Sequence, residues 1–169
     1  MSIYSYKDAC VVDCEMCYTV NGLELTKVTV VGMDGSIVYD SYVKPDHEIV
    51  DYNTRFSGIT AQHITLKNTR NIGQVQRDLM KFIHERTILI GHALDNDLRA
   101  LKLVHQNIVD TSHVFPHKNG LPYRRSLKDL TSTIVNRNIQ IGALGQDSCE
   151  RAVICMQLMF WKVKADFHI

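Results

Sequence analysis

The hydrophobic pattern of the N-terminal part of the chain predicts three neighbouring β-strands. Residues 10–16 form an apolar, β-branched run that ends in acidic side chains. Residues 23–31 alternate before becoming continuously β-branched, and residues 37–43 alternate again. Asp34 and Gly35 supply a hairpin turn between the last two runs. We therefore expect an antiparallel meander with residues 10–16 as its central strand.

The rest of the chain predicts short apolar strands that alternate with amphipathic helices. The expected helices cover residues 61–64, 71–85, 92–105, 127–136 and 148–164, and the expected strands cover residues 87–91 and 108–111. Residues 46–60 have the composition of a polar loop. This order of elements predicts an α/β fold, a mixed sheet with helices on both faces.

Composition limits the class of protein. A chain of 169 residues with 45% apolar and 22% charged residues is typical of one globular domain, here residues 1–169. The formal charge of +1 means that nucleic-acid binding would need a local basic patch. No apolar run approaches the ~20 residues of a membrane span, so we expect no membrane partner.

The five cysteines form no disulfide framework, which favours a reduced, intracellular protein. Cys14 and Cys17 form a single C-x-x-C pair, but a structural zinc ion would need a second pair of ligands at suitable spacing. We expect buried thiols instead.

Two acidic side chains at the end of the first strand are candidates for chemistry. Asp13 and Glu15 lie two positions apart, so an extended strand points both to one side. Two carboxylates this close repel unless a cation lies between them, and Mg²⁺ prefers such oxygen ligands. Asp97, one turn into a helix that follows a short strand, is expected to meet them. The alternative is that all three side chains face water, and His92 beside them is expected to be a packing histidine.

Several stretches of the chain resemble one known family. They are Val12-Asp13-Cys14-Glu15-Met16, Gly22-Leu23-Glu24-Leu25-Thr26, Phe56-Ser57-Gly58-Ile59-Thr60, Ile90-Gly91-His92-Ala93-Leu94 and Leu121-Pro122-Tyr123-Arg124-Arg125-Ser126-Leu127. In this order they resemble the Rex-type RNA exonucleases, the branch of RNA exonuclease 1 homologs within the DEDDh 3′–5′ exonucleases.

The resemblance implies an RNase H-like fold and a nuclear location. It also implies a two-metal mechanism, in which four carboxylates hold two Mg²⁺ or Mn²⁺ ions and a histidine acts as general base. Asp13, Glu15 and Asp97 match the first three carboxylates.

The chain departs from the family at the remaining two positions. It reads Gly145-Gln146-Asp147-Ser148-Cys149-Glu150-Arg151-Ala152, with Gln146 at the histidine position and Arg151 at the aspartate position. Glutamine has no titratable nitrogen, and arginine carries a permanent positive charge. Glu150 lies about 100° away around the helix, and Asp147 is expected to pair with Arg151. We interpret the domain as a degenerate, inactive exonuclease.

Charge counting gives a further expectation for this site. Three carboxylates and one guanidinium can hold at most one divalent ion. Arg151 is expected to turn toward Asp13 or Glu15 in a charge-assisted pair and to stand in for the second ion.

The family's substrate groove is the other part of the resemblance. It implies that Met16, Arg55, Phe56, Ser57 and Gly58 flank a terminal nucleotide. Tyr123, Arg124 and Arg125 would contact phosphate. The ordinary alternatives are a core role for Phe56 and a solvated loop for the two arginines.

Three functions therefore stay open. The first is a pseudo-exonuclease that binds the 3′ end of single-stranded RNA or a protein partner. The second is an active metal-dependent 3′–5′ exoribonuclease with a different base. The third is a pure protein–protein scaffold. Gln146 and Arg151 favour the first over the second.

Overall fold

The sheet is mixed and has its first strand near the centre. The computed structural model describes residues 8–135 and 147–167. The strands are β1 (Ala9–Thr19), β2 (Gly22–Gly32), β3 (Ile37–Tyr42), β4 (Ile49–Asp51), β5 (Ile88–Gly91) and β6 (Ile108–Asp110). Their order is β3-β2-β1-β5-β6, with β4 paired to β1. The predicted antiparallel meander is confirmed, because β1 pairs with β2 and β2 pairs with β3. Its expected central strand was wrong, since β2 lies between the other two. β1 is central only in the whole sheet, where β5 and β6 run parallel to it.

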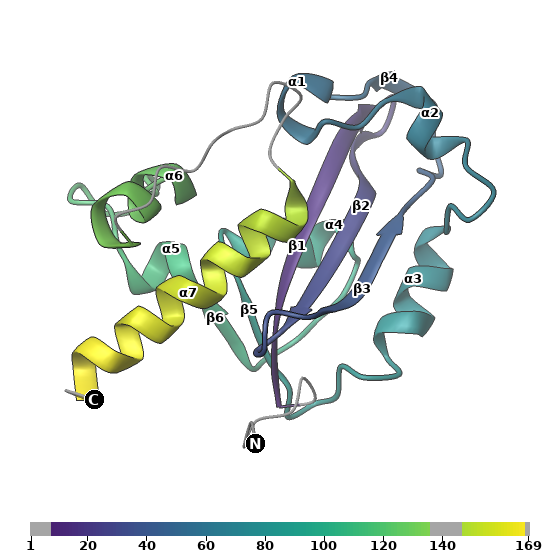
Figure 1. Cartoon of the computed structure of the whole chain (residues 1–169). Coiled ribbons are helices and arrows are strands. Elements are labelled where there is room, and N and C mark those ends of the chain that lie inside the picture. Colours follow the sequence, from purple (N-terminus) through teal and green to yellow (C-terminus); the bar gives the residue numbers. More distant parts are fainter. Residues whose placement is uncertain (1–7, 136–146, 168–169) are drawn as a thin grey trace.

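Helices cover both faces of this sheet, as the hydrophobic pattern predicted (Figure 1). They are α1 (Thr54–Ser57), α2 (Ala61–Ile64), α3 (Ile72–Leu79), α4 (Leu94–Ala100), α5 (Thr111–Val114), α6 (Leu127–Leu130), the π-helical turn η1 (Thr131–Val135) and α7 (Ser148–Phe167). The long helix α7 crosses one face, while α3 and α4 lie on the other (Figure 1). Within the described ranges, no helix has the length and apolar character needed to cross a membrane.

Several predicted boundaries were wrong. The segment 46–60, expected to be a loop, contains β4 and α1. Helices α3 and α4 are shorter than expected, since they end at Leu79 and Ala100. Apolar residues beyond these ends, such as Phe82 and Leu103, still pack on the core without helical backbone geometry, which explains why the periodicity continued.

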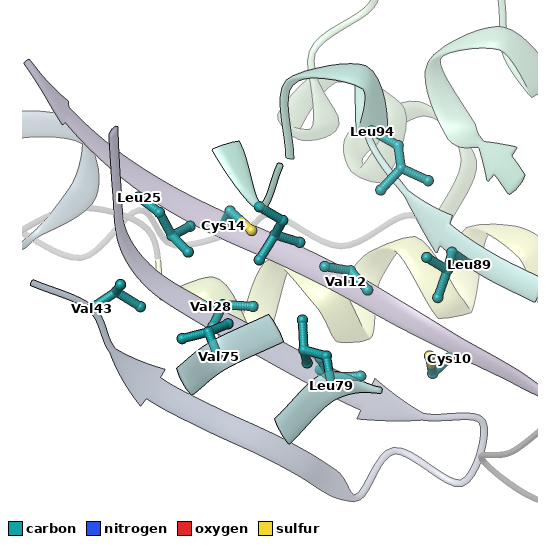
Figure 2. Close-up of a cluster of buried hydrophobic side chains, with 12 residues drawn as sticks. Cys10, Val12, Cys14, Leu25, Val28, Val43, Val75, Leu79, Leu89 and Leu94 are labelled. Carbon is teal, nitrogen blue, oxygen red and sulfur yellow. The ribbon is translucent and has the colours of Figure 1, made fainter. Parts of the chain in front are cut away.

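The alternation of β1 divides the core into two layers. Cys10, Val12 and Cys14 point toward α3 and α4, where they pack with Val75, Leu79, Leu89 and Leu94 (Figure 2). Val11 points to the opposite face and packs with residues of α6 and α7. The expectation of buried thiols is confirmed for Cys10, Cys14, Cys17 and Cys155, whereas Cys149 is half-buried.

One edge of β1 is left open between two partners, and this opening positions the site. β2 pairs with β1 from Cys10 to Thr19 on one edge. On the other edge, β5 pairs only with Ala9–Val11, and β4 pairs only with Tyr18 and Thr19. Among the strands that the structure describes, none pairs with that edge between Val11 and Tyr18. This open edge places side chains of β1 beside the beginning of α4.

Candidate functional site

Two carboxylates project from β1 toward α7. Asp13 and Glu15 share the face of Val11, as their spacing predicted, and are only 7% and 5% exposed. Across the ladder, Thr29 lies opposite Asp13 and Lys27 lies opposite Glu15. Directly after Glu15 the register shifts, and such irregularities are common beside functional sites because they redirect neighbouring side chains.

Asp97 reaches the open edge of β1 from α4. It is 6% exposed, and its carboxylate accepts the backbone N–H of Cys14, which has no strand partner on that side. The predicted meeting of Asp97 with Asp13 is confirmed, because both line one cavity. The alternative, that all three carboxylates face water, is wrong, because all three side chains are buried.

Asp110, which the sequence analysis did not single out, fixes the position of α4. Its carboxylate accepts hydrogen bonds from the N–H groups of Ala93, Leu94 and Ser112, at 2.8–3.0 Å, and from the Ser112 hydroxyl. Burial alone would raise the pKa of Asp110, but these hydrogen bonds lower it below the ordinary value. Asp110 therefore holds the first turn of the helix that carries Asp97.

The N-terminus of α7 is anchored to β2 and carries Arg151. The Ser148 hydroxyl, which is buried, lies 2.6 Å from the Thr29 hydroxyl, and Asp147 accepts the N–H of Cys149 as a helix cap. Thr29 lies opposite Asp13 in the sheet. Arg151, about one helical turn after Ser148, is therefore placed directly over the carboxylates.

Arg151 forms the ion pair that charge counting predicted. Its Nε lies 3.1 Å from each oxygen of Asp13, and its Nη2 donates to Oδ2 at 2.5 Å. The same Nη2 lies 3.0 Å from Glu15 Oε1, although the angle there gives no hydrogen bond. The expected pairing of Arg151 with the Asp147 side chain was wrong, because that carboxylate lies 3.7 Å from Lys27 instead. Charge-assisted contacts with a buried carboxylate are stronger than one exposed contact on a helix surface.

Burial dominates the electrostatics of the three carboxylates. It raises the pKa of Glu15 to about 8, opposed by Arg151 and increased further by Asp13. Burial also raises the pKa of Asp97 well above its ordinary value, with the Asp13 charge adding to the effect. The pKa of Asp13 is raised by burial too, and the Arg151 guanidinium opposes that rise most strongly. The Arg151 guanidinium is therefore the main group that favours the ionised form of Asp13.

This donor set does not fit a pair of divalent ions. Among the described residues, no group of three histidine, cysteine or acidic side chains is arranged to hold a metal ion. Asp13 directs both oxygens to Arg151, and Arg151 Nη2 also donates to the carbonyl of Cys14. A fixed cation therefore occupies the position between the carboxylates. Gln146, the residue at the position of the general base, lies outside the described residues.

Two cavities meet at this cluster. The first, here the His92 cavity, has a volume of about 360 Å³ and is lined by Asp13, His92, Asn96, Asp97, Ser126 and Lys128, among others. The second, the Phe56 cavity, has a volume of about 380 Å³ and is lined by Glu15, Tyr18, Leu23, Asn53, Phe56 and Arg99, among others. Cys14, Met16, Asn96 and Arg151 line both. These four shared residues form the boundary between the His92 cavity and the Phe56 cavity.

The residues that the resemblance assigned to substrate are only partly brought together. Met16 and the exposed Phe56 line the cavities, and the Arg55 guanidinium lies 5.6 Å from the Phe56 ring centre. Ser57 and Gly58 instead shape the local backbone. The Ser57 hydroxyl is buried and bonded to the main chain, and Gly58 ends α1 with a positive φ of 69°.

The arginines of the basic loop are already paired. Arg124 donates to Asp95 at 2.9 Å, and Arg125 donates to Asp129 at 2.6 Å. Neither arginine lines the two cavities, and the exposed Tyr123 packs near His117 instead. The cations that do line the cavities with Arg151 are Lys128 and Arg99.

The sequence analysis missed other residues that line the cavities, although the helical spacing of three of them could have indicated a shared face. Asn96, Arg99 and Ala100 stand at positions i, i+3 and i+4 of α4, so they share one helix face.

His92 was expected to be a packing histidine. Its Nδ1 lies 2.9 Å from the Thr111 hydroxyl, its ring also bonds to the backbone of Arg125, and burial lowers its pKa. It lines the His92 cavity as a neutral, hydrogen-bonded side chain.

Comparison with known proteins agrees with this architecture. The sequence profile of the RNase T family, described as exonuclease, matches residues 10–140. Exonuclease GOR of Pan troglodytes is 51% identical over 160 residues, which are 95% of this chain and 23% of that protein. RNA exonuclease 1 homolog of Homo sapiens is 51% identical over 154 residues, 91% of this chain and 12% of that protein. This chain thus spans less than a quarter of either relative.

A solved structure shares the fold. The catalytic unit of Neurospora crassa Pan2, a protease and nuclease domain, superposes with a TM-score of 0.82 at 22% identity, covering 99% of this chain and 29% of that one. The mixed sheet, its flanking helices and this superposition define an RNase H-like α/β fold. The chain belongs to the exonuclease family, in which it is a Rex-type DEDDh RNA exonuclease domain.

The first prediction concerns the stability that Arg151 provides. Replacing Arg151 by alanine removes the partner of a buried carboxylate, so we expect the free energy of unfolding at pH 7.5 to fall by about 3 kcal/mol. Lys162→Ala is the matched control, because Lys162 lies on the same helix and pairs with Asp166 near the surface. That change should cost less than about 1 kcal/mol. Equal losses in urea denaturation would contradict the structural role of the ion pair.

The second prediction concerns pH. Because the pKa of Glu15 rises from 4.5 to about 8 on folding, the folded state binds its proton more tightly than the unfolded state does. The stability linked to this proton is fully present below pH 4.5 and is lost as the pH rises through 8. Glu15→Gln should remove this loss, so that the variant gains at least about 2 kcal/mol relative to the wild type between pH 4.5 and 8.5. Glu85→Gln, at an exposed position, is the control. Parallel stability curves for the wild type and Glu15→Gln would contradict the assignment.

Proposed function

We propose that this domain is a pseudo-exonuclease that binds the 3′ end of single-stranded RNA without hydrolysing it. One observation carries the proposal. Arg151 forms a bidentate ion pair with Asp13. The family resemblance leads us to expect a metal-binding aspartate at position 151. A guanidinium stays protonated in proteins, so it cannot become an anionic ligand.

The chemical consequence is the loss of two groups that act together in catalysis, the general base at position 146 and the fourth carboxylate at position 151. Two-metal phosphodiester hydrolysis uses paired ions to activate water and to stabilise both the attacking and the leaving oxygen. Here the carboxylates face a fixed cation, and Gln146 has no nitrogen that takes up a proton near neutral pH. Removing members of such a unit costs orders of magnitude in rate.

The cavities support RNA as the ligand. The family is one of RNA exonucleases, and the Phe56 cavity offers exposed aromatic surface from Phe56 and Tyr18 beside the cation Arg99. Stacking of a base on an aromatic side chain contributes about 1–3 kcal/mol, and cations nearby bind phosphate. Since this chain spans only part of its relatives' length, a protein partner and a nuclear location are further proposals for the protein that contains the domain.

The third prediction is the absence of cleavage. Single-stranded RNA labelled at its 5′ end should keep its length when incubated with the protein in Mg²⁺ or Mn²⁺, because neither the base nor the fourth carboxylate is present. Stepwise 3′ shortening that disappears in Asp13→Ala would establish the rival function, an active exoribonuclease with a different base.

Restoration of the missing groups provides the matched test of the same prediction. The double change Gln146→His with Arg151→Asp should give more cleavage than either single change, because the two groups act together. A single change that recovers as much as the pair would show that only one departure matters.

The fourth prediction concerns the salt dependence of RNA binding. Lys128 and Arg99 are exposed, line the cavities and form no ion pair within the described part of the chain. Each neutralised phosphate contributes about 0.7 to the slope of log affinity against log salt for single strands. Lys128→Ala and Arg99→Ala should each flatten the slope by about that amount. Arg124→Ala and Arg125→Ala should change it less, since these guanidiniums pair with Asp95 and Asp129.

Failure of this test has a defined meaning. If the wild type shows no RNA binding by fluorescence anisotropy, the proposed function is wrong and the scaffold hypothesis replaces it. If Arg124→Ala and Arg125→Ala flatten the slope most, the phosphates follow the basic loop rather than the cavities.

A further inference from the structure

The Arg151 guanidinium still has donors to offer to a ligand. An arginine carries five N–H groups, and Asp13 and the carbonyl of Cys14 engage those of Nε and Nη2. Nη1 donates no hydrogen bond to any residue that the structure describes. The side chain is 18% exposed and lines both the His92 cavity and the Phe56 cavity. The Arg151 guanidinium, with free N–H donors, thus lies at the boundary between the two cavities.

Counted as formal charges, the side chains around the two cavities balance without any added ion. Their combined lining contains three carboxylates, from Asp13, Glu15 and Asp97, and three cations, from Arg99, Lys128 and Arg151. If position 151 carried an aspartate, four carboxylates would face two cations. A phosphate entering that cluster would meet a net negative charge and would need a divalent ion to be admitted.

We propose that Arg151 takes the place of a divalent ion as the cation that receives an internucleotide phosphate, so that RNA binding by this domain does not depend on metal. One nucleotide then occupies each cavity, and the phosphate that joins them lies at Nη1 between Met16 and Asn96, which both cavities share. Guanidinium groups suit this role because they form directed, charge-assisted hydrogen bonds to phosphate oxygens. The inference rests on the proposed RNA-binding function and adds the source of the positive charge.

The position of Arg151 makes this cation a permanent part of the fold. Asp13 holds one edge of the guanidinium plane, and the Ser148–Thr29 hydrogen bond holds the helix that carries it. The donors are therefore oriented before RNA arrives, which reduces the side-chain entropy lost on binding. A divalent ion, in contrast, must be captured from solution.

The fifth prediction tests metal independence directly. We would measure the affinity for a short single-stranded RNA with a 5′ fluorophore, in excess EDTA and in millimolar Mg²⁺. The wild type should bind with the same affinity in both, within about twofold. Arg151→Asp should bind at least about tenfold more weakly in EDTA and should recover in Mg²⁺, because four carboxylates then need an ion to accept phosphate. Lys162→Asp, which makes the same charge change on the same helix away from the cavities, should show no such dependence on Mg²⁺.

Two further arms keep the outcomes distinct. Arg151→Met removes the charge without adding a carboxylate, so it should weaken binding in EDTA, and Mg²⁺ should restore less of the affinity than it does in Arg151→Asp. Thermal unfolding verifies that each variant is folded. Wild-type binding that requires Mg²⁺ would overturn this inference and leave the proposed function standing. Binding of Arg151→Asp in EDTA that equals the wild type would also overturn it. No RNA binding under any condition would overturn the proposed function itself.

Discussion

A carboxylate that is withdrawn from water needs a cation or a set of donors, and this requirement organises the centre of the domain. Asp13 is 7% exposed and finds its cation in Arg151, which comes from a helix far along the chain. The pair in turn depends on the seating of α7, since the Ser148–Thr29 contact determines which turn of the helix faces β1. Sheet register, helix anchor and ion pair therefore form one interdependent arrangement. Removing one partner of such a buried pair costs more than the pair contributes when intact, because the remaining charge is left without compensation.

Local pattern was sufficient to predict the parts of this arrangement that follow from the geometry of single elements. The two-residue period of a strand placed Asp13 and Glu15 together. The family resemblance placed Arg151 beside them, and charge counting then predicted the ion pair. The predicted pairing of Asp147 with Arg151 was wrong, because Asp147 pairs with Lys27 instead. Lys27 comes close only through the alignment of β2 with β1, which the local sequence does not show. The same limit applies to Asp110, whose role in fixing α4 appears only when β6 lies beside β5.

Short elements show a related limit. β4 has three residues and α1 has four, so neither carries enough periodicity to be recognised in a polar segment. β4 forms because the end of β1 offers Tyr18 and Thr19 as partners, which is information from another part of the fold. The cations that line the cavities were not singled out in the sequence for a similar reason. Two adjacent arginines dominate the basic loop in sequence, yet the structure pairs both with aspartates and leaves Lys128 and Arg99 open.

The open edge of β1 also bears on how copies of the domain avoid one another. A strand edge with free N–H and C=O groups can pair with the same edge of a second molecule, which is a common beginning of aggregation. Here the gap between β5 and β4 falls in the long, largely buried strand β1, and Asp97 fills part of it by accepting the N–H of Cys14. A side chain that already accepts this N–H leaves it unavailable to a second strand. Asp97 therefore blocks part of an edge at which a second strand could pair, whether or not the domain ever holds an ion.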